Sequence, residues 1–414
     1  MNKKTLLILL SLFLSANNVF AQYIADSTKH ILADSSKIMF KKVVPEKDLM
    51  DVIHGLRKKK NNQNGDKKKT ETDNYHFALV PGGGYSLQTG VAGFVAANFI
   101  FYNDSAKLQE STIAGNIAYT QYKQIIFPIN ANVWTKQNTY NFISDFRYMN
   151  YPSVTFGLGA KSRITNEYDI DYDYIKLHQT VLRRISTNIS AGIGYYYDYF
   201  WNVKEINPPA NTVTSFQRYG LTTTETASGI NYQAIFDNRD NPVNPFQGLY
   251  VSARYRTNYK WLGSNSNWSQ GILEIKKYFT FPRNSKNVLA LWNYNWFTFS
   301  GKPPYLLLPS TGWDDFYNTG RGYIQGRYRA NDMSYLEAEY RFRITRNGLI
   351  GGVVFGNVQS FSRAISDEFK DNVLGYGLGI RVKMNKNSLT NLCIDYGFGS
   401  NGSGGIFINL GEVF

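Results

Sequence analysis

The most restrictive feature of the sequence is a two-residue alternation of apolar and polar side chains that continues over segments of ten or more residues. It is clearest at 374–384, where bulky apolar residues alternate with glycine, arginine and lysine. The segments 335–344 and 249–260 repeat it, with mostly charged side chains on the polar side. Successive side chains of a β-strand point to opposite faces, so each segment predicts a strand with one apolar and one polar face.

The predicted strands are long enough to cross a membrane. Strands of globular sheets usually have about five or six residues, whereas about ten residues tilted by about 45° cross a bilayer. We count sixteen candidate strands, and an even number suits an antiparallel barrel whose two ends lie on the same side. The first is expected to be the weakest, because it is short and Pro81-Gly82-Gly83-Gly84 follows it. The sixteen segments are 75–81, 89–102, 111–122, 126–137, 140–150, 168–185, 187–201, 226–237, 247–260, 266–281, 286–299, 334–346, 349–358, 373–384, 389–398 and 405–414.

Composition favours a membrane barrel over the other classes that alternation allows. Charged residues make up 18% of the 414 residues and aromatic residues 16%, against roughly 25% charged residues in ordinary globular chains. The mean hydropathy of −0.35 argues against a bundle of spanning helices, as does the lack of any apolar run of about 18 residues after residue 21. A soluble β-sandwich shares the alternation but has shorter strands. The expected fold class is therefore all-β, a 16-stranded antiparallel transmembrane β-barrel with a short, mostly disordered N-terminal periplasmic segment.

The first 74 residues differ in composition from the rest of the chain. Residues 1–21 have the basic start, apolar core and small-residue end of a secretory signal peptide. Residues 22–74 are expected to form a periplasmic basic lead, with one short amphipathic helix near 45–56 and a solvated, lysine-rich linker. The basic run could instead bind polyanions, but export argues against nucleic acid as the partner. The transmembrane β-barrel is assigned to residues 75–414.

The C-terminal segment carries a second sign of export. The chain ends on Phe414, and the last strand is expected to place Ile406, Ile408 and Leu410 on one outward face. Glu412 interrupts this face and is expected at the level of the lipid head groups. The segment resembles the C-terminal signal of bacterial outer-membrane barrels. It predicts a protein of the bacterial outer membrane whose N-terminus lies in the periplasm.

Two motifs narrow the resemblance to one family. Segment 237–248 joins the eighth and ninth predicted strands, and Gly320-Arg321-Gly322-Tyr323 lies in the long connection between the eleventh and twelfth. Together they resemble the BamA/TamA superfamily of outer-membrane β-barrels, the bacterial surface antigen type. The resemblance implies that the first segment is a periplasmic turn, and that the second is an extracellular loop whose arginine folds back into the lumen. The candidate turn residues are Asp237, Arg239, Asp240, Pro245 and Gly248.

An arginine inside a barrel needs carboxylate partners, because a desolvated guanidinium is stable only when it is paired. Alternation places Glu337 and Glu339 on the polar face of the strand after the loop, and Glu339 better matches the family's position. The family usually supplies a second acid on the next strand, where this chain has Asn357. These three residues are the proposed partners of a latch on Arg321. The alternative is that Arg321 lies on an ordinary surface turn.

The resemblance also implies a function. Members of the family that insert or transport proteins generally carry periplasmic POTRA modules, and residues 22–74 are too few for one. The chain therefore resembles a barrel-only branch that lacks POTRA modules. We expect it to assist insertion or translocation of proteins or lipids through a seam between the first and last strands. The expected partners are outer-membrane lipids including lipopolysaccharide, unfolded outer-membrane proteins and periplasmic factors, with no nucleic acid.

The sequence leaves two alternative functions open. A passive, anion-preferring, porin-like barrel is the alternative. The basic residues that would face its lumen are Arg254, Arg256, Lys260, Arg341, Arg343, Arg381 and Lys383. An enzyme is not expected, since His76 and His178 lie in no nucleophile or metal motif; the alternative is a lipase with a Ser/His pair at the lumen rim. No cofactor or metal is expected, and the lone Cys393 excludes disulfides and cysteine-based metal sites.

Overall fold

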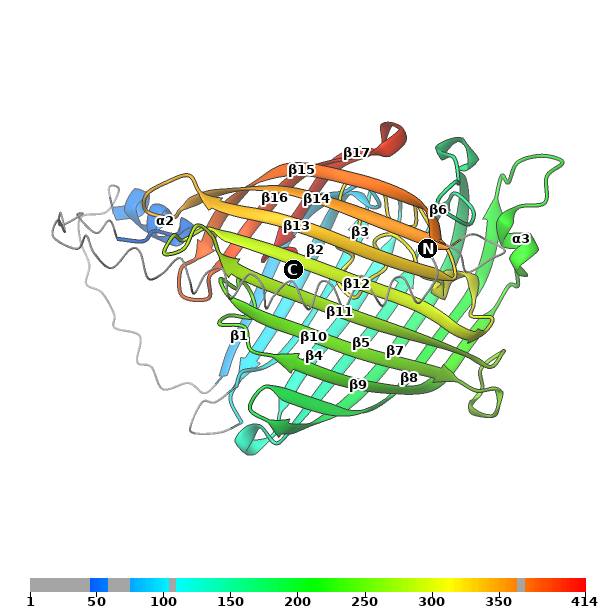
Figure 1. The fold of residues 1–414 in the computed structure, drawn as a ribbon, viewed down its shortest axis with the longest axis horizontal. Helices are drawn as coiled ribbons and strands as arrows, with labels where there is room; N and C mark the ends of the chain where they lie inside the picture. The colour runs from blue at the N-terminus through cyan, green and yellow to red at the C-terminus, as the bar shows by residue number, and fades with distance from the viewer. Residues whose placement is uncertain (1–44, 59–74, 104–108, 363–368) are drawn as a thin grey trace, which may run out of the picture.

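The computed structural model describes residues 45–58, 75–103, 109–362 and 369–414. In them the chain forms one antiparallel sheet that rolls into a nearly closed barrel (Figure 1). Sixteen long strands make the wall, and a further strand of three residues, β6, pairs with the outer part of β7. The predicted fold class is confirmed. The predicted signal peptide and most of the basic lead lie outside the described residues.

The strands are β1 (Tyr75–Ser86), β2 (Gly90–Phe101), β3 (Ser111–Thr120), β4 (Ile125–Trp134), β5 (Tyr140–Asn150), β6 (Ser153–Thr155), β7 (Tyr168–Ser186), β8 (Ile189–Ile206), β9 (Glu225–Asp237), β10 (Gly248–Asn258), β11 (Trp268–Thr280), β12 (Val288–Gly301), β13 (Asp332–Arg343), β14 (Ile350–Ser362), β15 (Phe369–Asn385), β16 (Thr390–Gly399) and β17 (Gly404–Leu410). The α-helices are α2 (Leu49–Lys58) and α3 (Ser215–Tyr219). Short 3-10 turns are η2 (Lys136–Asn138), η3 (Ile164–Asn166), η4 (Lys260–Leu262), η5 (Tyr305–Leu307) and η6 (Ser400–Gly402).

Alternation sorts the side chains between lipid and lumen. On β15, Leu374, Tyr376 and Leu378 are about 60% exposed on the outside, whereas Arg381 and Lys383 are buried inside. An apolar outer face and a charged inner face are the reverse of a soluble sandwich, and they define a transmembrane barrel. In the described part of the chain, no helix has the length and apolar character needed to cross a membrane.

The two ends of the barrel differ in what covers them (Figure 1). At one end lie α2 and the short turns, including the turn between β9 and β10; we call this the α2 end. At the other end lie β6, α3 and the outer parts of the long strands β7 and β8; we call this the α3 end. Because the wall strands alternate in direction and β6 is not one of them, the turns at the α2 end are those that follow β2, β4, β7, β9, β11, β13 and β15.

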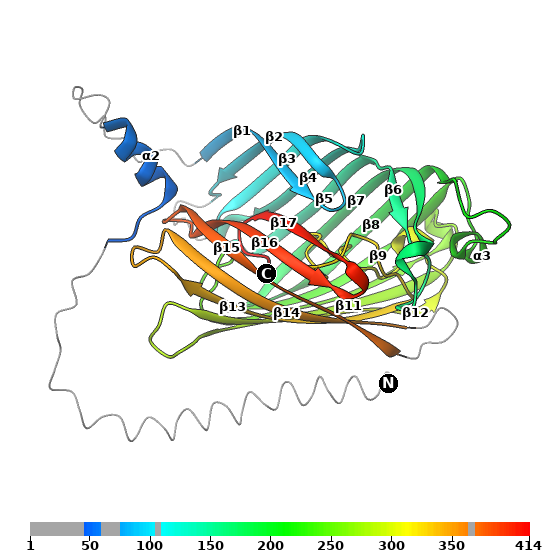
Figure 2. The ribbon, with the colours of Figure 1, turned by 90° about the horizontal axis from the view of Figure 1, so that it is seen from above.

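The connection between β12 and β13, residues 302–331, folds back into the barrel, and we call it the lumen loop (Figure 2). Its first part, with Tyr305 and Leu308, packs on buried residues of β7 and β8 such as Tyr172. Its last part, with Tyr323 and Tyr328, packs against the wall from β11 to β14. The loop therefore occupies the middle of the lumen and bridges two opposite sides of the wall.

One strand prediction was wrong in an informative way. The first strand was expected to end at residue 81, but β1 continues to Ser86 and pairs with β2 along its whole length. A strand at the edge of a sheet tolerates proline, and glycines can pair through their backbone without side chains to place. The shortest wall strand is instead the last, β17, with 7 residues.

Candidate functional site

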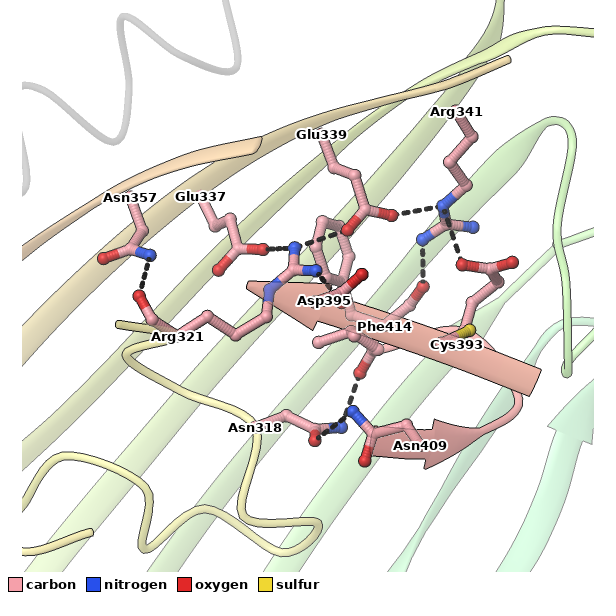
Figure 3. A network of polar contacts seen from close by, with 12 residues as sticks. Asn318, Arg321, Glu337, Glu339, Arg341, Asn357, Cys393, Asp395, Asn409 and Phe414 are labelled. Atoms are coloured by element: carbon pink, nitrogen blue, oxygen red, sulfur yellow. Dashed lines mark hydrogen bonds and ion pairs between the residues drawn. The ribbon is translucent and has the colours of Figure 1, made fainter. Parts of the chain in front are cut away.

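Arg321 of the lumen loop lies at the centre of a buried ionic cluster (Figure 3). Its guanidinium donates hydrogen bonds to Glu337 and Glu339 of β13, and its Nη1 lies 2.7 Å from Oδ2 of Asp395 on β16. The side chain of Arg321 is 1% exposed and all three carboxylates are buried. Its Cζ also lies 3.7 Å from the centre of the Phe355 ring on β14. One side chain therefore connects the loop to three strands of the wall.

The cluster balances its charge through two further arginines. Arg341 pairs with Glu339, and Nη1 of Arg381 lies 2.5 Å from Oδ1 of Asp395. Charged groups away from water are stable only when they are paired and hydrogen-bonded, and removing one partner typically costs about 3–5 kcal/mol. The cluster is therefore expected to fix the loop firmly to the β13–β16 wall.

Glycines in the wall make room for the loop. Gly322 has a φ of +107°, a conformation that other residues rarely adopt. A Cβ on Gly397 of β16 would lie 2.5 Å from the Gly322 nitrogen, and one on Gly375 of β15 would lie 2.8 Å from the Arg321 oxygen. The glycines that alternate with apolar residues in these strands thus form a smooth floor under the loop backbone.

The structure places Asn357 beside the loop but not on the guanidinium. Its Nδ2 donates to the backbone oxygen of Arg321 at 3.0 Å. The second acid comes instead from Asp395, which the sequence reasoning did not assign as a partner. Alternation indicates only that Asp395 faces inward, as Cys393 and Gly397 do on the same strand, and not that it contacts Arg321.

The C-terminal signal is split between two faces, contrary to the expectation of one outward face. Ile406, Ile408 and Leu410 are exposed on the outside, but β17 ends at Leu410 and Phe414 is buried in the lumen. The physical reason is Gly411, whose φ of +92° turns the chain inward. The expectation for Glu412 was also wrong.

The inward tail is bound on several sides. The Phe414 ring lies 5.2 Å from the Trp292 ring, and the Phe414 oxygen accepts a hydrogen bond from Arg341 at 2.7 Å. Glu412 is buried and pairs with Arg381 at 2.8 Å. The last four residues therefore belong to the same ionic cluster as Arg321.

The tail also touches the lumen loop directly. Asn318 of the loop donates from Nδ2 to the Val413 oxygen at 2.7 Å, and Asn409 of β17 donates to Asn318 at 3.4 Å (Figure 3). The loop, the wall and the end of the last strand thus share one network.

The 237–248 motif organises a turn at the α2 end. Arg239 donates from Nε and Nη2 to the two Asp237 oxygens at 2.9 and 2.8 Å. Asp240 accepts the backbone N–H groups of residues 246 and 247. Gly248 has a φ of +117°, and a Cβ there would lie 2.6 Å from the Arg239 Cα. Pro245 lies within the same turn. These groups hold one another in place and fix the shape of the turn.

Most of the predicted lumen cations are neutralised. Arg254 pairs with Asp315 of the lumen loop at 2.7 Å, and Arg256 pairs with Asp198 at 2.6 Å. Arg341 and Arg381 belong to the Arg321 cluster described above. Lys260 lies exposed in η4, a 3-10 turn at the α3 end. Paired cations attract mobile anions only weakly, so the inward basic residues give little support to an anion-selective pore.

A cavity of about 100 Å³ lies between the lumen loop and the wall from β7 to β12. His178 and Asp198 both line it and lie 3.0 Å apart, but no serine, threonine or cysteine is among its lining residues. The other barrel histidine, His76, is on β1, and Cys393 is buried with its Sγ 3.1 Å from the Gly411 oxygen. Among the described residues, no three histidine, cysteine or carboxylate side chains are arranged to hold a metal ion.

The junction between β1 and β17 differs from every other junction in the wall. Each adjacent pair from β1–β2 to β16–β17 forms an antiparallel ladder, with β5 joined to β7. β1 and β17 lie side by side, yet no ladder joins them within the described residues. At the α3 end, the side chain of Leu87 covers Gly405. A Cβ added to Gly405 would lie 2.2 Å from the Leu87 Cδ2 atom.

Solved structures show the same architecture. BamA from Haemophilus ducreyi lacking POTRA domains 1–3 matches with a TM-score of 0.54 and 13% identity, over 82% of this chain and 69% of that one. CdiB from Acinetobacter baumannii matches with a TM-score of 0.53 and 13% identity, over 82% and 60%. CdiB from Escherichia coli matches with a TM-score of 0.55 and 8% identity, over 84% and 66%. The fold is that of the BamA and CdiB barrels.

The resemblance predicted from the two motifs is thus confirmed at the level of the fold. No family model matches the sequence, and no curated protein matches it either. The chain spans about two thirds of the length of the BamA and CdiB chains.

Proposed function

We propose that the chain is an outer-membrane barrel that assists insertion or translocation of proteins or lipids through the β1–β17 seam. The observation that carries the proposal is the missing ladder between two strands that lie side by side. Every other junction of the wall has a ladder, so this is the junction that opens at the lowest cost in backbone hydrogen bonds.

The free edge of β1 suits an incoming strand. Residues 75–83 are exposed, including Phe77 and Leu79 at 65% and 61%. An unpaired edge offers a row of N–H and C=O groups that a client strand can complete. Pro81 lacks an N–H and blunts part of this edge, which limits uncontrolled pairing with other chains.

The contents of the lumen favour the seam as the route. The lumen loop and the C-terminal tail fill the interior, and both are held by buried ion pairs and aromatic contacts. Because most inward cations are paired as well, no observation favours the passive anion-preferring pore.

The family resemblance suggests the orientation and the partners. The α2 end is assigned to the periplasm, as short turns and the N-terminal lead suggest. Clients are unfolded outer-membrane proteins or lipids, delivered with periplasmic factors, and lipopolysaccharide surrounds the outer half of the wall. The proposal includes no catalytic step, cofactor or nucleic acid.

A disulfide across the seam tests this role. Leu87→Cys and Gly405→Cys, in a Cys393→Ser background, place two thiols where Leu87 now covers Gly405. The purified full chain is placed in liposomes, and the rate at which it inserts another unfolded barrel is measured. We expect the oxidised protein to lose the stimulation and the reduced protein to regain it.

The matched control locks a junction that is already a ladder. Ile394→Cys and Ile408→Cys join β16 to β17 at paired positions and should leave the insertion rate unchanged. If the seam-locked protein inserts clients as fast as this control, the seam is not the route. Single-channel recording adds an arm, since a large and steady anion-selective conductance would support the pore instead.

A further inference from the structure

The α2 end carries an ionic contact that lies outside the lumen network. The carboxylate of Glu46 forms ion pairs with Nζ of Lys286 at 2.8 Å, Nη2 of Arg343 at 2.7 Å and Nζ of Lys383 at 3.4 Å. These three cations come from the β11–β12 turn, the end of β13 and the end of β15. Three separate segments of the rim therefore converge on one carboxylate.

The contact continues along the next residues. Asp48 accepts the backbone N–H of Lys386 at 3.0 Å, and Nζ of Lys386 pairs with Asp51 at 2.8 Å. We call Lys286, Arg343, Lys383 and Lys386 the basic rim, and residues 46–51 the acidic stretch. Figure 2 shows α2, which begins within this stretch, standing off the end of the barrel rather than inside it.

The contact between the acidic stretch and the basic rim is polar, so another acidic segment could replace it. Neither apolar cluster of the barrel includes a residue of 45–58, and Met50 of α2 is 49% exposed. The contact therefore rests on ion pairs and on two backbone N–H groups, of Lys47 to the Asn347 oxygen and of Lys386 to Asp48. Lys286 and Glu46 keep 62% and 31% of their side chains exposed, whereas Lys383 keeps 8%. Exposed ion pairs contribute about 0–1 kcal/mol each and are screened by salt.

The basic rim has no carboxylates of the barrel to neutralise it. Within the described residues, its four cations form ion pairs with the acidic stretch alone. Clusters of arginine and lysine that lack fixed partners are a common means of recognising acidic peptide segments.

We propose that the basic rim is a docking site for an acidic segment of a partner protein, and that residues 46–51 occupy this site in cis as a competitor. The spacing of Glu46, Asp48 and Asp51 shows the pattern of carboxylates that fits the site. A tethered segment acts at an effective concentration of about millimolar, so a free partner binds only when it displaces the acidic stretch. The inference does not depend on the seam, because the docking is measured without insertion.

The test uses the full chain in detergent and a fluorescent peptide that copies residues 45–58. The competitor is neutralised with Glu46→Gln, Asp48→Asn and Asp51→Asn, which lie outside the barrel wall. Fluorescence anisotropy should show the peptide binding to this triple variant about tenfold or more tightly than to the unaltered chain. Raising the salt concentration from about 50 to about 500 mM should weaken this binding strongly.

Two controls make the result specific. Lys286→Ala with Arg343→Ala in the triple variant should abolish binding, whereas Lys136→Ala, an exposed lysine on the β4–β5 turn, should leave it unchanged. A peptide with Gln and Asn at the three acidic positions should not bind. Equal affinity of the triple variant and the unaltered chain would overturn the proposal, as would equal binding of the acidic and neutral peptides.

Discussion

The β13–β16 wall and the β1–β17 junction belong to the same sheet but are held together in opposite ways. In the wall, continuous ladders are reinforced from inside by Arg321, which reaches β13 and β16 at once. At the junction, the ladder is missing and Leu87 covers Gly405 at one end. A ladder thus joins each pair of neighbouring strands from β13 to β16, whereas the ladder is missing at the β1–β17 junction one strand away.

The two regions differ in the contacts that would have to break for the barrel to open there. Opening the wall would break a ladder and separate buried charges from their partners, whereas opening the seam would break no backbone ladder. The C-terminal tail connects the two regions, because it follows β17 and ends beside Arg341 of the wall. Under the proposed function, β1 is therefore the strand expected to move, while β17 stays fixed to the wall.

The largest effect is expected from removing the side chain of Arg321, which holds the lumen loop to the wall. Arg321→Ala leaves Glu337, Glu339 and Asp395 buried with fewer cations, and it should destabilise the barrel by about 3–5 kcal/mol. Urea unfolding in detergent, followed by tryptophan fluorescence, measures the change. Arg346→Ala, at an exposed arginine of the β13–β14 turn, should shift stability by less than about 0.5 kcal/mol. If the two variants unfold alike, the cluster does not stabilise the wall.

Removing the tail's aromatic anchor tests the link between the two regions. Phe414→Ala deletes a buried ring that packs on Trp292, and should cost about 3 kcal/mol. It should also loosen β17, so exchange of its backbone amides with deuterium should speed up more than exchange in β14. Phe316→Ala, at a lumen-loop residue that is 74% exposed, is the matched control and should change neither quantity measurably. Equal exchange in β17 before and after the change would show that the tail does not hold the strand.

A methyl group on a glycine of the wall should push the lumen loop away from the wall without altering a charge. Gly397→Ala places a methyl group 2.5 Å from the Gly322 nitrogen and should cost about 1–3 kcal/mol. The lumen loop should then become more accessible to protease, whereas Gly93→Ala on β2, with open space around its Cβ position, should have no such effect. A Gly397→Ala chain with normal stability and loop protection would mean that the close contact is not needed.

Strand positions could be predicted because alternation is a local property of the sequence. The bounds of β5 and β7 were predicted within one residue, since each sequence run shows the two faces directly. The extent of β1 could not be predicted, because glycine and proline give no face to read and only pairing with β2 settles the matter. Periodicity likewise placed Glu337 and Glu339 on the lumen face, whereas their pairing with Arg321 was predicted from the family resemblance.

The rest of the site depends on contacts between distant segments. Asp395 is 74 residues from Arg321, and nothing local distinguishes it from other inward polar residues. The inward turn of the tail rests on one positive φ at Gly411, which a strand pattern does not reveal. The contact of Glu46 with the rim joins residues separated by up to 337 positions.

The smallest effect concerns the contact of Glu46 with the ends of β13 and β15, away from the Arg321 cluster and from the β1–β17 junction. Hydrogen bonds from Lys286 and then Arg343 lower the pKa of Glu46 from its ordinary 4.5 to about 2. Its docking contribution is therefore complete above about pH 4.5 and is lost as the pH falls toward 2. A dye on Met50→Cys, in a Cys393→Ser background, should gain mobility over that interval, whereas Glu46→Gln should make the dye more mobile above about pH 4.5 and reduce its change in mobility below it. Mobility that is constant between pH 6 and 2.5 in the unaltered chain would contradict this, because protonation must weaken the attraction of three cations to one carboxylate.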